Sequence, residues 1–366
     1  MCAVHVETQS TISALAGFGA ETRSWNELLM HGSSSLAGLS SRQHSSAPDD
    51  KPRFLITIDT EGDDQWRNTS GAPTKNSLFI PRFQELCEDF HLKPTYLTNY
   101  EMACCPDFQR LGRRILNHNS GEIGMHLHAW NSPPFRSGAL HDGRHGTFLT
   151  QCSEQAMREK IAYMTALLED TFGVKPRSHR AGRWAFDERY ARLLEENGYE
   201  VDCSVTPGVS WRAEARIHGV LAPDYTRFRS DPYWLDLSNI AEEGHSRLLE
   251  VPVTIFRNRS WAWVGPSIAR RALSRFLPES IWLRPNGRNL RHMLRILQRC
   301  LDEGRVHAQF MLHSSELMPG GSPVFDTKEQ ILRLYKHLRV LFKHVADRFQ
   351  PATLSEFYAW WRLRKS

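Results

Sequence analysis

The sequence predicts an α/β fold with a barrel architecture. From Arg53 onward, short apolar runs of strand length alternate with longer segments whose apolar residues recur at helical spacing. The apolar runs number seven, and polar residues gather at their C-terminal ends. Active sites of α/β barrels lie at that end of the strands. The alternation of strands and helices favours a barrel over a sandwich or a helical bundle.

The expected elements follow one another in a regular order. Strands are expected at 53–59, 93–99, 122–128, 176–182, 199–205, 247–255 and 307–313. Helices are expected at 78–90, 107–118, 153–171, 187–198, 288–303 and 326–345, with a last short helix from 353. Capping patterns mark the last two helix starts, Asp326 with Glu329 and Thr353 with Glu356.

The composition is that of an ordinary globular protein. Of the 366 residues, 40% are hydrophobic and 24% are charged, and no apolar run approaches the roughly 20 residues that span a bilayer. No secretory signal is recognised near the start, and seven cysteines without a C-x-x-C motif indicate reduced thiols, so we expect a cytoplasmic protein. The net charge of +5 does not by itself indicate nucleic-acid binding, and no nucleic-acid partner is expected.

The chain divides into two regions by composition. Residues 1–50 are Ser-rich and show no periodicity, so we expect a disordered or non-native N-terminal tail. Residues 51–366 are expected to form a single barrel domain. An insertion at about 256–305 separates the sixth and seventh strands.

Two pairs of polar residues at strand ends have the same spacing. Asp59 and Glu61 follow the first strand, and His126 and His128 end the third. Residues i and i+2 of a strand face the same side, so each pair points one way. Two imidazoles and a carboxylate are a common ligand set for a divalent metal such as zinc. Three further candidates lie at the fourth, fifth and seventh strands: Arg180, Asp202 and His313.

Each of these residues also has a simpler interpretation. A lone Asp at a strand end is usually a turn or cap residue, and most H-x-H pairs bind no metal. A lone Arg180 is more often a surface residue, and a lone His313 more often a structural hydrogen-bonding group. The combination at successive strand ends nevertheless favours a catalytic site.

The order of the motifs "TIDTEGDD", "EIGMHLHAWN", "HRAGRWAFD", "VDCSV" and "FMLHSSE" resembles the polysaccharide deacetylase superfamily, also called the NodB-homology or carbohydrate esterase 4 superfamily. The resemblance covers about residues 52–358, and "HSSELMPGGSP" looks like the WalW-type subgroup near lipopolysaccharide biosynthesis. It implies a distorted (β/α)7 barrel of the glycoside hydrolase/deacetylase type. It also implies a divalent metal, often zinc, and removal of acetyl groups from sugars.

The resemblance implies a metal ligand set with two departures from the usual motif. The metal carboxylate usually follows the catalytic base directly, where Thr60 stands here, so Glu61 is the expected ligand. His126 matches the first metal histidine. The second usually lies four residues later, where Trp130 stands, and His128 is the nearest substitute.

The resemblance also implies the catalytic roles. Asp59 matches the base that removes a proton from the attacking water, and Arg180 matches the arginine that orients it. His313 matches the general acid of the last motif, and Asp202 fits the acidic residue that supports that histidine.

The segment 256–289 is expected to influence substrate choice. It holds seven arginines against one glutamate, together with several aromatic residues. Aromatic faces suit sugar rings and arginine forks suit phosphates, so an acylated carbohydrate or lipid-linked sugar is the expected partner, with peripheral membrane contact through 256–289. An insertion helix with a solvated basic face is the simpler alternative. The expected substrate-binding residues are Trp130, Arg183, Trp184, Trp282 and Arg284.

Three functions compete at this stage. The first is a metal-dependent hydrolase that removes an acetyl or formyl group from an amino sugar or sugar ester in envelope polysaccharide metabolism. The second is hydrolysis of a non-sugar C–N bond, as in allantoinase-like relatives. The third is a non-catalytic carbohydrate-binding protein on a degenerate barrel, which the absent i+4 histidine would favour.

Overall fold

The computed structural model describes residues 51–63, 72–135, 148–212, 222–257 and 280–365. The predicted tail at 1–50 and most of the basic part of the insertion lie outside these residues. All the described residues belong to one compact unit. Within the described residues, no helix is both long enough and apolar enough to cross a membrane.

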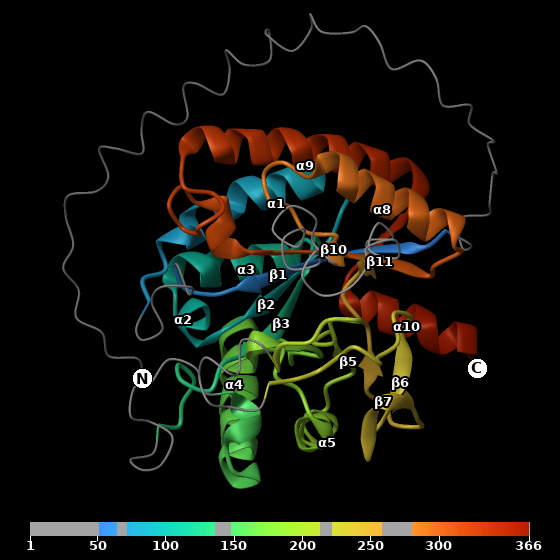
Figure 1. The fold of residues 1–366 in the computed structure, drawn as a ribbon. Helices are drawn as coiled ribbons and strands as arrows, with labels where there is room; N and C mark the ends of the chain where they lie inside the picture. The colour runs from blue at the N-terminus through green and yellow to red at the C-terminus, as the bar shows by residue number, and fades with distance from the viewer. Residues whose placement is uncertain (1–50, 64–71, 136–147, 213–221, 258–279, 366) are drawn as a thin grey trace, which may run out of the picture. The chain divides into compact units, whose positions relative to one another are not determined.

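A curled, mostly parallel sheet forms the centre of the fold (Figure 1). Its strand order is β11-β1-β2-β3-β4-β5-β8-β6-β7, and β12 pairs with β1. The seven predicted strands all lie in the parallel part: β1 (Arg53–Thr60), β2 (Pro94–Thr98), β3 (Glu122–Leu127), β4 (Ser178–Ala181), β5 (Val201–Asp202), β8 (Leu249–Glu250) and β11 (His307–His313). The predicted α/β barrel-type fold is therefore confirmed.

Helices connect the strands and cover the outside of the sheet. Figure 1 shows α1, α8 and α9 along one side of the strands, and α4 and α5 along another. The α-helices are α1 (Ile80–Asp89), α2 (Tyr100–Ala103), α3 (Pro106–Asn117), α4 (Glu154–Phe172), α5 (Glu188–Glu196), α8 (Leu290–Asp302), α9 (Lys328–Arg348) and α10 (Leu354–Lys365). Thr353 and Glu356 cap α10 reciprocally, as predicted. The cap of α9 is Thr327 with Gln330, one residue later than predicted.

The predicted strand 247–255 is divided in the structure. It gives β8 and, after a short interruption, β9 (Ile255–Arg257), which pairs with β10 (Ser280–Trp282). Pro252 lies in the interruption, and because proline has no N–H it cannot donate to a strand ladder. An antiparallel hairpin of β6 (Tyr233–Asp236) and β7 (Asn239–Glu243), which the sequence analysis did not predict, extends the sheet beyond β8.

The chain just after β8 and strand β11 lie beside each other without forming a ladder. The backbone of Leu283 links them: its N–H donates to Thr254 O at 3.1 Å, and its carbonyl accepts from Met311 N at 3.2 Å. The imidazole of His307 adds a contact to Pro252 O at 3.0 Å. The segment that follows β10 therefore closes the curled sheet at this seam.

Strand β1 shows how the fold places polar groups inside the barrel. Phe54, Ile56 and Ile58 belong to the apolar cluster under the helices. The alternating residues Leu55, Thr57 and Asp59 face the opposite side, and they change from apolar to polar along the strand. The interior is therefore apolar near the start of β1 and carries reactive groups near its C-terminal end.

Candidate metal centre and active site

Glu61, His126 and His128 form one buried cluster of potential metal ligands. One ligand atom from each residue lies within 4.8 Å of the other two. The carboxylate oxygen Oε2 of Glu61 is 2.9 Å from His128 Nε2 and 3.5 Å from His126 Nε2. One carboxylate and two imidazoles are a donor set that zinc and similar divalent ions bind, with positions left for water and substrate. The three residues therefore fit the predicted metal site.

The hydrogen bonds of His126 prepare it to be a ligand. Its Nδ1 lies 2.9 Å from the backbone carbonyl of Arg180, which can only accept, so Nδ1 carries the proton. Nε2, which faces Glu61, is then the atom that would give its lone pair to a bound cation. A second hydrogen bond that fixes the ring and its tautomer is typical of metal-binding histidines.

The electrostatics of the cluster favour a bound cation. Burial raises the pKa of Glu61, but hydrogen bonds from His126 and His128 lower it below its usual range. Burial lowers the pKa of His126, but the carboxylates of Asp59 and Glu61 raise it, and the net shift is upward. Burial and the neighbouring His126 lower the pKa of His128 to about 4. Glu61 is thus anionic and His128 neutral near pH 7, as metal ligands must be.

His128 reaches the cluster because it is packed tightly on two sides. The ring of Trp130 lies against it, with centroids 4.2 Å apart. On the other side is Gly182, where an added Cβ would lie 2.4 Å from His128 Nδ1. Trp130 therefore supports the ring of His128. The requirement for glycine at 182 follows from the same close approach.

Asp59 is held by Arg180 inside the barrel. Arg180 is fully buried; its Nη1 donates to Asp59 Oδ1 at 2.5 Å and its Nη2 donates to Thr57 Oγ1 at 2.8 Å. Its Nε donates to the carbonyl of Cys203 at 3.1 Å. Burial raises the pKa of Asp59, but the Arg180 charge lowers it, and the net shift is downward. The contact expected between Arg180 and Asp59 is present. It involves Oδ1 of Asp59, whereas Oδ2 faces His313.

His313 faces the same two carboxylates from the end of β11. Its Nε2 is 3.6 Å from Asp59 Oδ2 and 3.7 Å from Glu61 Oε1. Asp59 and His313 are paired in the register of β1 and β11, so their side chains share one face of the sheet. Six residues therefore converge at the C-terminal ends of β11, β1, β3 and β4: Asp59, Glu61, His126, His128, Arg180 and His313.

The expectation that Asp202 supports His313 is wrong. Asp202 pairs in register with His179, which precedes Arg180 and faces the opposite side of the sheet. Its Oδ1 lies 2.6 Å from His179 Nδ1, and its Oδ2 accepts from Ser204 N at 2.9 Å. The carboxylate beside His313 is instead that of Glu316, which accepts from His313 N at 2.8 Å. The sequence signal for Glu316 was its position three residues after His313.

Tryptophans form a half-buried group beside Arg180. Trp184 lies under the Arg180 guanidinium, 5.1 Å from Cζ to the ring centroid. It stacks on Trp211 at 6.2 Å and packs against Trp282 at 5.9 Å. Arg183 lies over Trp130 at 4.8 Å. The structure thus groups the predicted substrate-binding residues around the site and adds Trp211, which the sequence analysis did not single out.

The backbone at Arg183 and Trp184 is strained. Both residues have positive φ, 56° and 61°, which is uncommon outside glycine. The hydroxyl of Tyr225 donates to the carbonyl of Trp184 and holds this turn in place. Strained positions concentrate at functional sites, where the surrounding structure enforces them. The turn positions both side chains next to the metal cluster.

Glu101 is a further titratable group close to the cluster. It lies in α2, after β2, and its Oε2 accepts from Asn131 Nδ2 at 2.7 Å. Burial raises the pKa of Glu101 to about 7, with a further upward contribution from Glu61 that the Asn131 hydrogen bond opposes. No motif pointed to this residue, because the loops after β2 and β3 meet only in the fold.

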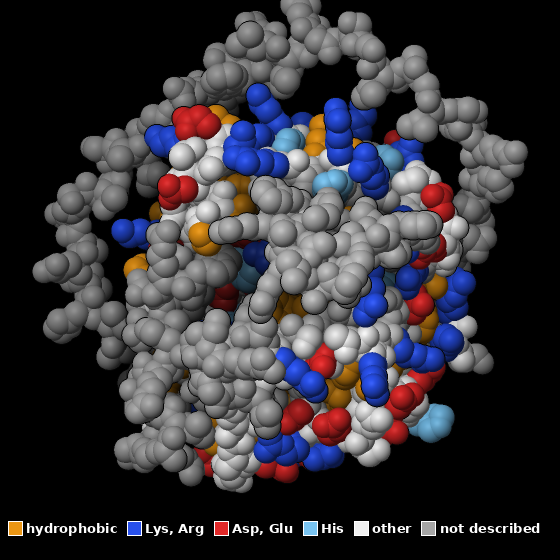
Figure 2. All heavy atoms as spheres, viewed as in Figure 1, with side chains coloured by type: hydrophobic (Ala, Val, Ile, Leu, Met, Phe, Trp, Pro, Cys, Tyr) orange, Lys and Arg blue, Asp and Glu red, His pale blue; other side chains and the backbone are white. Residues whose placement is uncertain are grey.

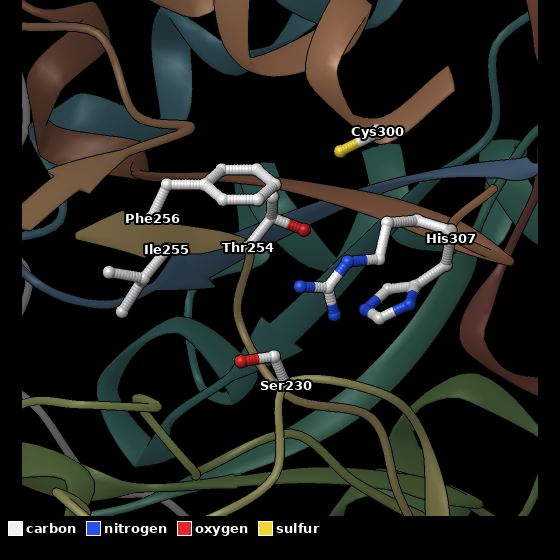
Figure 3. A pocket seen from close by; sticks show the side chains of 7 residues that line it. Ser230, Thr254, Ile255, Phe256, Cys300 and His307 are labelled. Carbon is white, nitrogen blue, oxygen red and sulfur yellow. The ribbon is translucent and has the colours of Figure 1, made fainter. Parts of the chain in front are cut away.

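Two other surface features lie away from these residues. The pocket of Figure 3 is lined by Thr254, Cys300 and His307 among others, at the first residue of β11. From there to His313 the strand rises roughly 20 Å, so this pocket is not the site. Figure 2 shows Lys, Arg and His side chains gathered where Figure 1 places α8 and α9. These two helices carry nine Lys and Arg against three Asp and Glu.

The comparisons with known proteins concern mainly deacetylase structures. No family model and no curated protein matches the chain. The fold is similar to that of a Mycobacterium smegmatis protein assigned as a polysaccharide deacetylase, with 17% identity, a TM-score of 0.49, and coverage of 90% of this chain and 96% of that one. It is also similar to the Xyl-CE4 domain of a xylanase from the hindgut metagenome of Trinervitermes trinervoides, at 9% identity, a TM-score of 0.40, and coverage of 84% and 90%.

A third similar structure is a CE4 family pseudoenzyme from Bacillus anthracis. The identity is 10% and the TM-score 0.38, with 85% of this chain and 66% of that chain covered. At such identities and TM-scores, the function of this chain has to be argued from its own side chains.

Proposed function

We propose that this chain is a metal-dependent hydrolase of the polysaccharide deacetylase type, which removes an acetyl or formyl group from an amino sugar or a sugar ester. One observation carries the proposal. Asp59, held by Arg180, and His313 lie beside the buried Glu61–His126–His128 donor set. Asp59 Oδ2 and His313 Nε2 are only 3.6 Å apart. A base, an acid and a cation site in one place are what amide or ester hydrolysis requires.

Each residue has a role that follows from its contacts. Glu61, His126 and His128 would hold a divalent ion, with zinc the best fit to the donor set. When bound, such an ion supplies Lewis acidity and makes water a better nucleophile near neutral pH. Asp59 accepts the proton of the attacking water at Oδ2, because Arg180 occupies Oδ1. His313 donates a proton from Nε2 to the departing sugar amine or hydroxyl.

The half-buried tryptophans support a carbohydrate as the substrate. Trp184, Trp211 and Trp282 offer aromatic faces beside the reactive groups, and sugar rings pack well on such faces. An envelope or lipopolysaccharide setting, a cytoplasmic location and a lipid-linked substrate belong to the proposal through the resemblance of the motifs. Contact with a membrane through 256–289 also belongs to it, although residues 258–279 lie outside the described part of the chain.

The proposal is tested by acetate and formate release from the zinc-loaded full chain. Suitable probes are N-acetylglucosamine oligomers, N-formylated amino sugars and an O-acetylated glycan. Asp59→Asn keeps the size of the side chain and removes the base, so we expect turnover to fall by about 10²-fold or more. Glu85→Gln, an exposed carboxylate on α1, serves as the matched control and should leave turnover unchanged.

Two results would replace the proposal by its alternatives. Turnover of a cyclic ureide such as allantoin, without acyl release from any sugar, would favour hydrolysis of a non-sugar C–N bond. Glycan binding that persists in Asp59→Asn, with no turnover and no metal in the wild type, would favour a carbohydrate-binding protein.

A further inference from the structure

Arg284 contacts His313 on the side opposite to the reactive groups. Its Nη2 lies 3.0 Å from His313 Nδ1 and donates to Glu316 Oε1 at 3.0 Å. The side chain of Glu316 is fully buried, whereas that of Arg284 is 27% exposed. Arg284, Glu316 and His313 therefore form a closed triangle behind the Nε2 atom that faces Asp59.

The seam of the barrel fixes the position of Arg284. Leu283, directly after β10, is bonded through its backbone to both Thr254 and Met311, which ties this stretch to β11. Leu283 is buried, whereas Trp282 and Arg284 on either side of it in the chain are half-buried. The carbonyl of Arg284 accepts from Asn289 Nδ2 at 2.7 Å, which anchors the turn that follows.

The chemistry of a guanidinium decides where the His313 proton resides. Arginine has donors and no acceptor, so Nδ1 of His313 must accept in this contact and the proton lies on Nε2. Nε2 is the atom directed at Asp59 Oδ2 and Glu61 Oε1. We propose that Arg284 is a positioning residue that holds His313 in its Nε2-protonated tautomer. This inference rests on the proposed function, in which His313 is the proton donor.

Glu316 alone would produce the opposite tautomer. Its Oε2 is 3.5 Å from His313 Nδ1, and a carboxylate accepts from an N–H. Burial raises the pKa of Glu316, but the Arg284 charge and contacts with His313, including the hydrogen bond from its backbone N–H, lower it to about 2, so the group is ionised near neutral pH. Without Arg284, this carboxylate would draw the proton to Nδ1 and leave Nε2 as an acceptor. Arg284 thus reverses the preference that Glu316 would impose.

The tautomer matters in the second half of the reaction. As the C–N or C–O bond to the sugar breaks, its electron pair moves to the departing nitrogen or oxygen. The Nε2–H bond breaks at the same time, its electron pair stays on Nε2, and the proton forms the new N–H or O–H bond. The proton that Asp59 took from the attacking water then passes from Oδ2 to Nε2 across the 3.6 Å contact, so that His313 does not remain an anion. A neutral His313 protonated at Nδ1 has no proton at the atom that faces the substrate.

Nitrogen NMR of the ring tests the tautomer without any need for turnover. The full chain is labelled with ¹⁵N-histidine, and His313→Gln identifies the His313 signals. In wild-type protein we expect a protonated Nε2 and an unprotonated Nδ1. In Arg284→Ala the proton should move to Nδ1, and Arg284→Lys, which keeps a pure donor, should restore the wild-type pattern. An unchanged tautomer in Arg284→Ala would overturn the inference even if the protein proves to be inactive.

Kinetics with two leaving groups separates proton donation from substrate binding. An aryl acetate such as 4-nitrophenyl acetate expels a stable phenolate and needs no acid, whereas an N-acetylated sugar must have its amine protonated. We expect Arg284→Ala to lower kcat on the sugar amide by about 10²-fold and kcat on the aryl ester by less than about 3-fold. Arg288→Ala, which removes an exposed arginine from the same loop, is the matched control.

The kinetic outcomes distinguish the two proposals. Equal losses on both substrates, or a rise in KM alone, would show that Arg284 binds substrate and would overturn the positioning role. A wild-type chain that hydrolyses neither substrate would instead contradict the proposed function, and the NMR result would then stand by itself.

Discussion

The guanidinium of Arg180 and the carboxylate of Asp59 form an ion pair in the interior of the barrel, where Arg180 is fully buried and Asp59 is 2% exposed. The pair joins β4 to β1 across the sheet. An isolated buried charge costs far more folding free energy than a paired one, so each of the two residues lowers the cost of burying the other. The pair therefore serves both the stability of the barrel and the ionised state of Asp59.

We expect Arg180→Met to be strongly destabilising. It leaves the Asp59 carboxylate buried without its partner, and the loss of one member of such a pair costs about 3–5 kcal/mol. Adding Asp59→Asn should recover part of that loss, because the orphaned charge is removed. Urea unfolding of both single variants and the double variant measures the coupling. Arg158→Met, which breaks an exposed pair with Glu196, should change the unfolding free energy little. Additive effects of the two buried substitutions would contradict the pairing.

His128→Ala should abolish tight metal binding. Loss of an outer hydrogen-bond partner alone weakens metal affinity by about 10–100-fold, so loss of a ligand should weaken it by more than about 100-fold. Zinc titration against a chelating dye, followed by metal analysis of the dialysed protein, measures the change. His118→Ala, an exposed histidine at the end of α3, is the matched control. Retention of zinc by His128→Ala would mean that the cluster of Glu61, His126 and His128 is not the metal site.

Trp130 should influence metal affinity without being a ligand. Its ring packs on His128 at 4.2 Å, so Trp130→Ala frees the imidazole to adopt other rotamers. We expect zinc affinity to fall by about 10-fold in Trp130→Ala and to change little in Trp130→Phe, which keeps an aromatic face. The same titration compares the two. Equal losses in both variants would argue that the indole N–H, and not the packing, is what matters.

The sequence was sufficient to predict the seven parallel strands and the two pairs of strand-end residues in the site, but not the β6–β7 hairpin. Strand parity placed Asp59 with Glu61 and His126 with His128, because spacing along one strand is a local property. The relation between different strands is not local. Asp202 was assigned to His313, but the register of β4 and β5 pairs it with His179 on the other face, and no sequence pattern states that register.

The support of His313 shows the same limit. Arg284 reaches His313 because Leu283 is bonded between Thr254 and Met311, which are far apart in the sequence. The aromatic and basic residues of the insertion predicted a role for Arg284 in substrate binding, whereas the structure places its guanidinium on the histidine. The sequence pattern singled out Arg284 as a candidate site residue. Its contact with His313 could be seen only in the folded structure.

Asp202→Asn should affect stability more than the metal centre. The carboxylate accepts from His179 and from Ser204, both buried, and it contacts neither Asp59 nor His313 among the described residues. Weakening these bonds should cost about 1–3 kcal/mol of unfolding free energy. We expect zinc affinity to stay within about threefold of wild type, since no ligand is displaced. A large loss of zinc with unchanged stability would show that Asp202 acts on the site after all.

The stability of the metal-free protein should depend on pH through Glu101. Burial raises the pKa of this carboxyl from 4.5 to about 7, so the folded state binds its proton more tightly than the unfolded state. The contribution of this proton binding to the free energy of unfolding is fully present below about pH 4.5 and is lost as the pH rises through about 7.

The variant Glu101→Gln keeps an acceptor for Asn131 and removes the titrating carboxyl. We therefore expect the variant to gain about 1–3 kcal/mol relative to wild type between pH 5 and pH 8. Urea midpoints after chelator treatment measure this, with Glu85→Gln on the exposed face of α1 as control. Parallel pH profiles for wild type and Glu101→Gln would contradict the assignment, whereas a difference that disappears when zinc is added would show that the bound cation keeps Glu101 ionised.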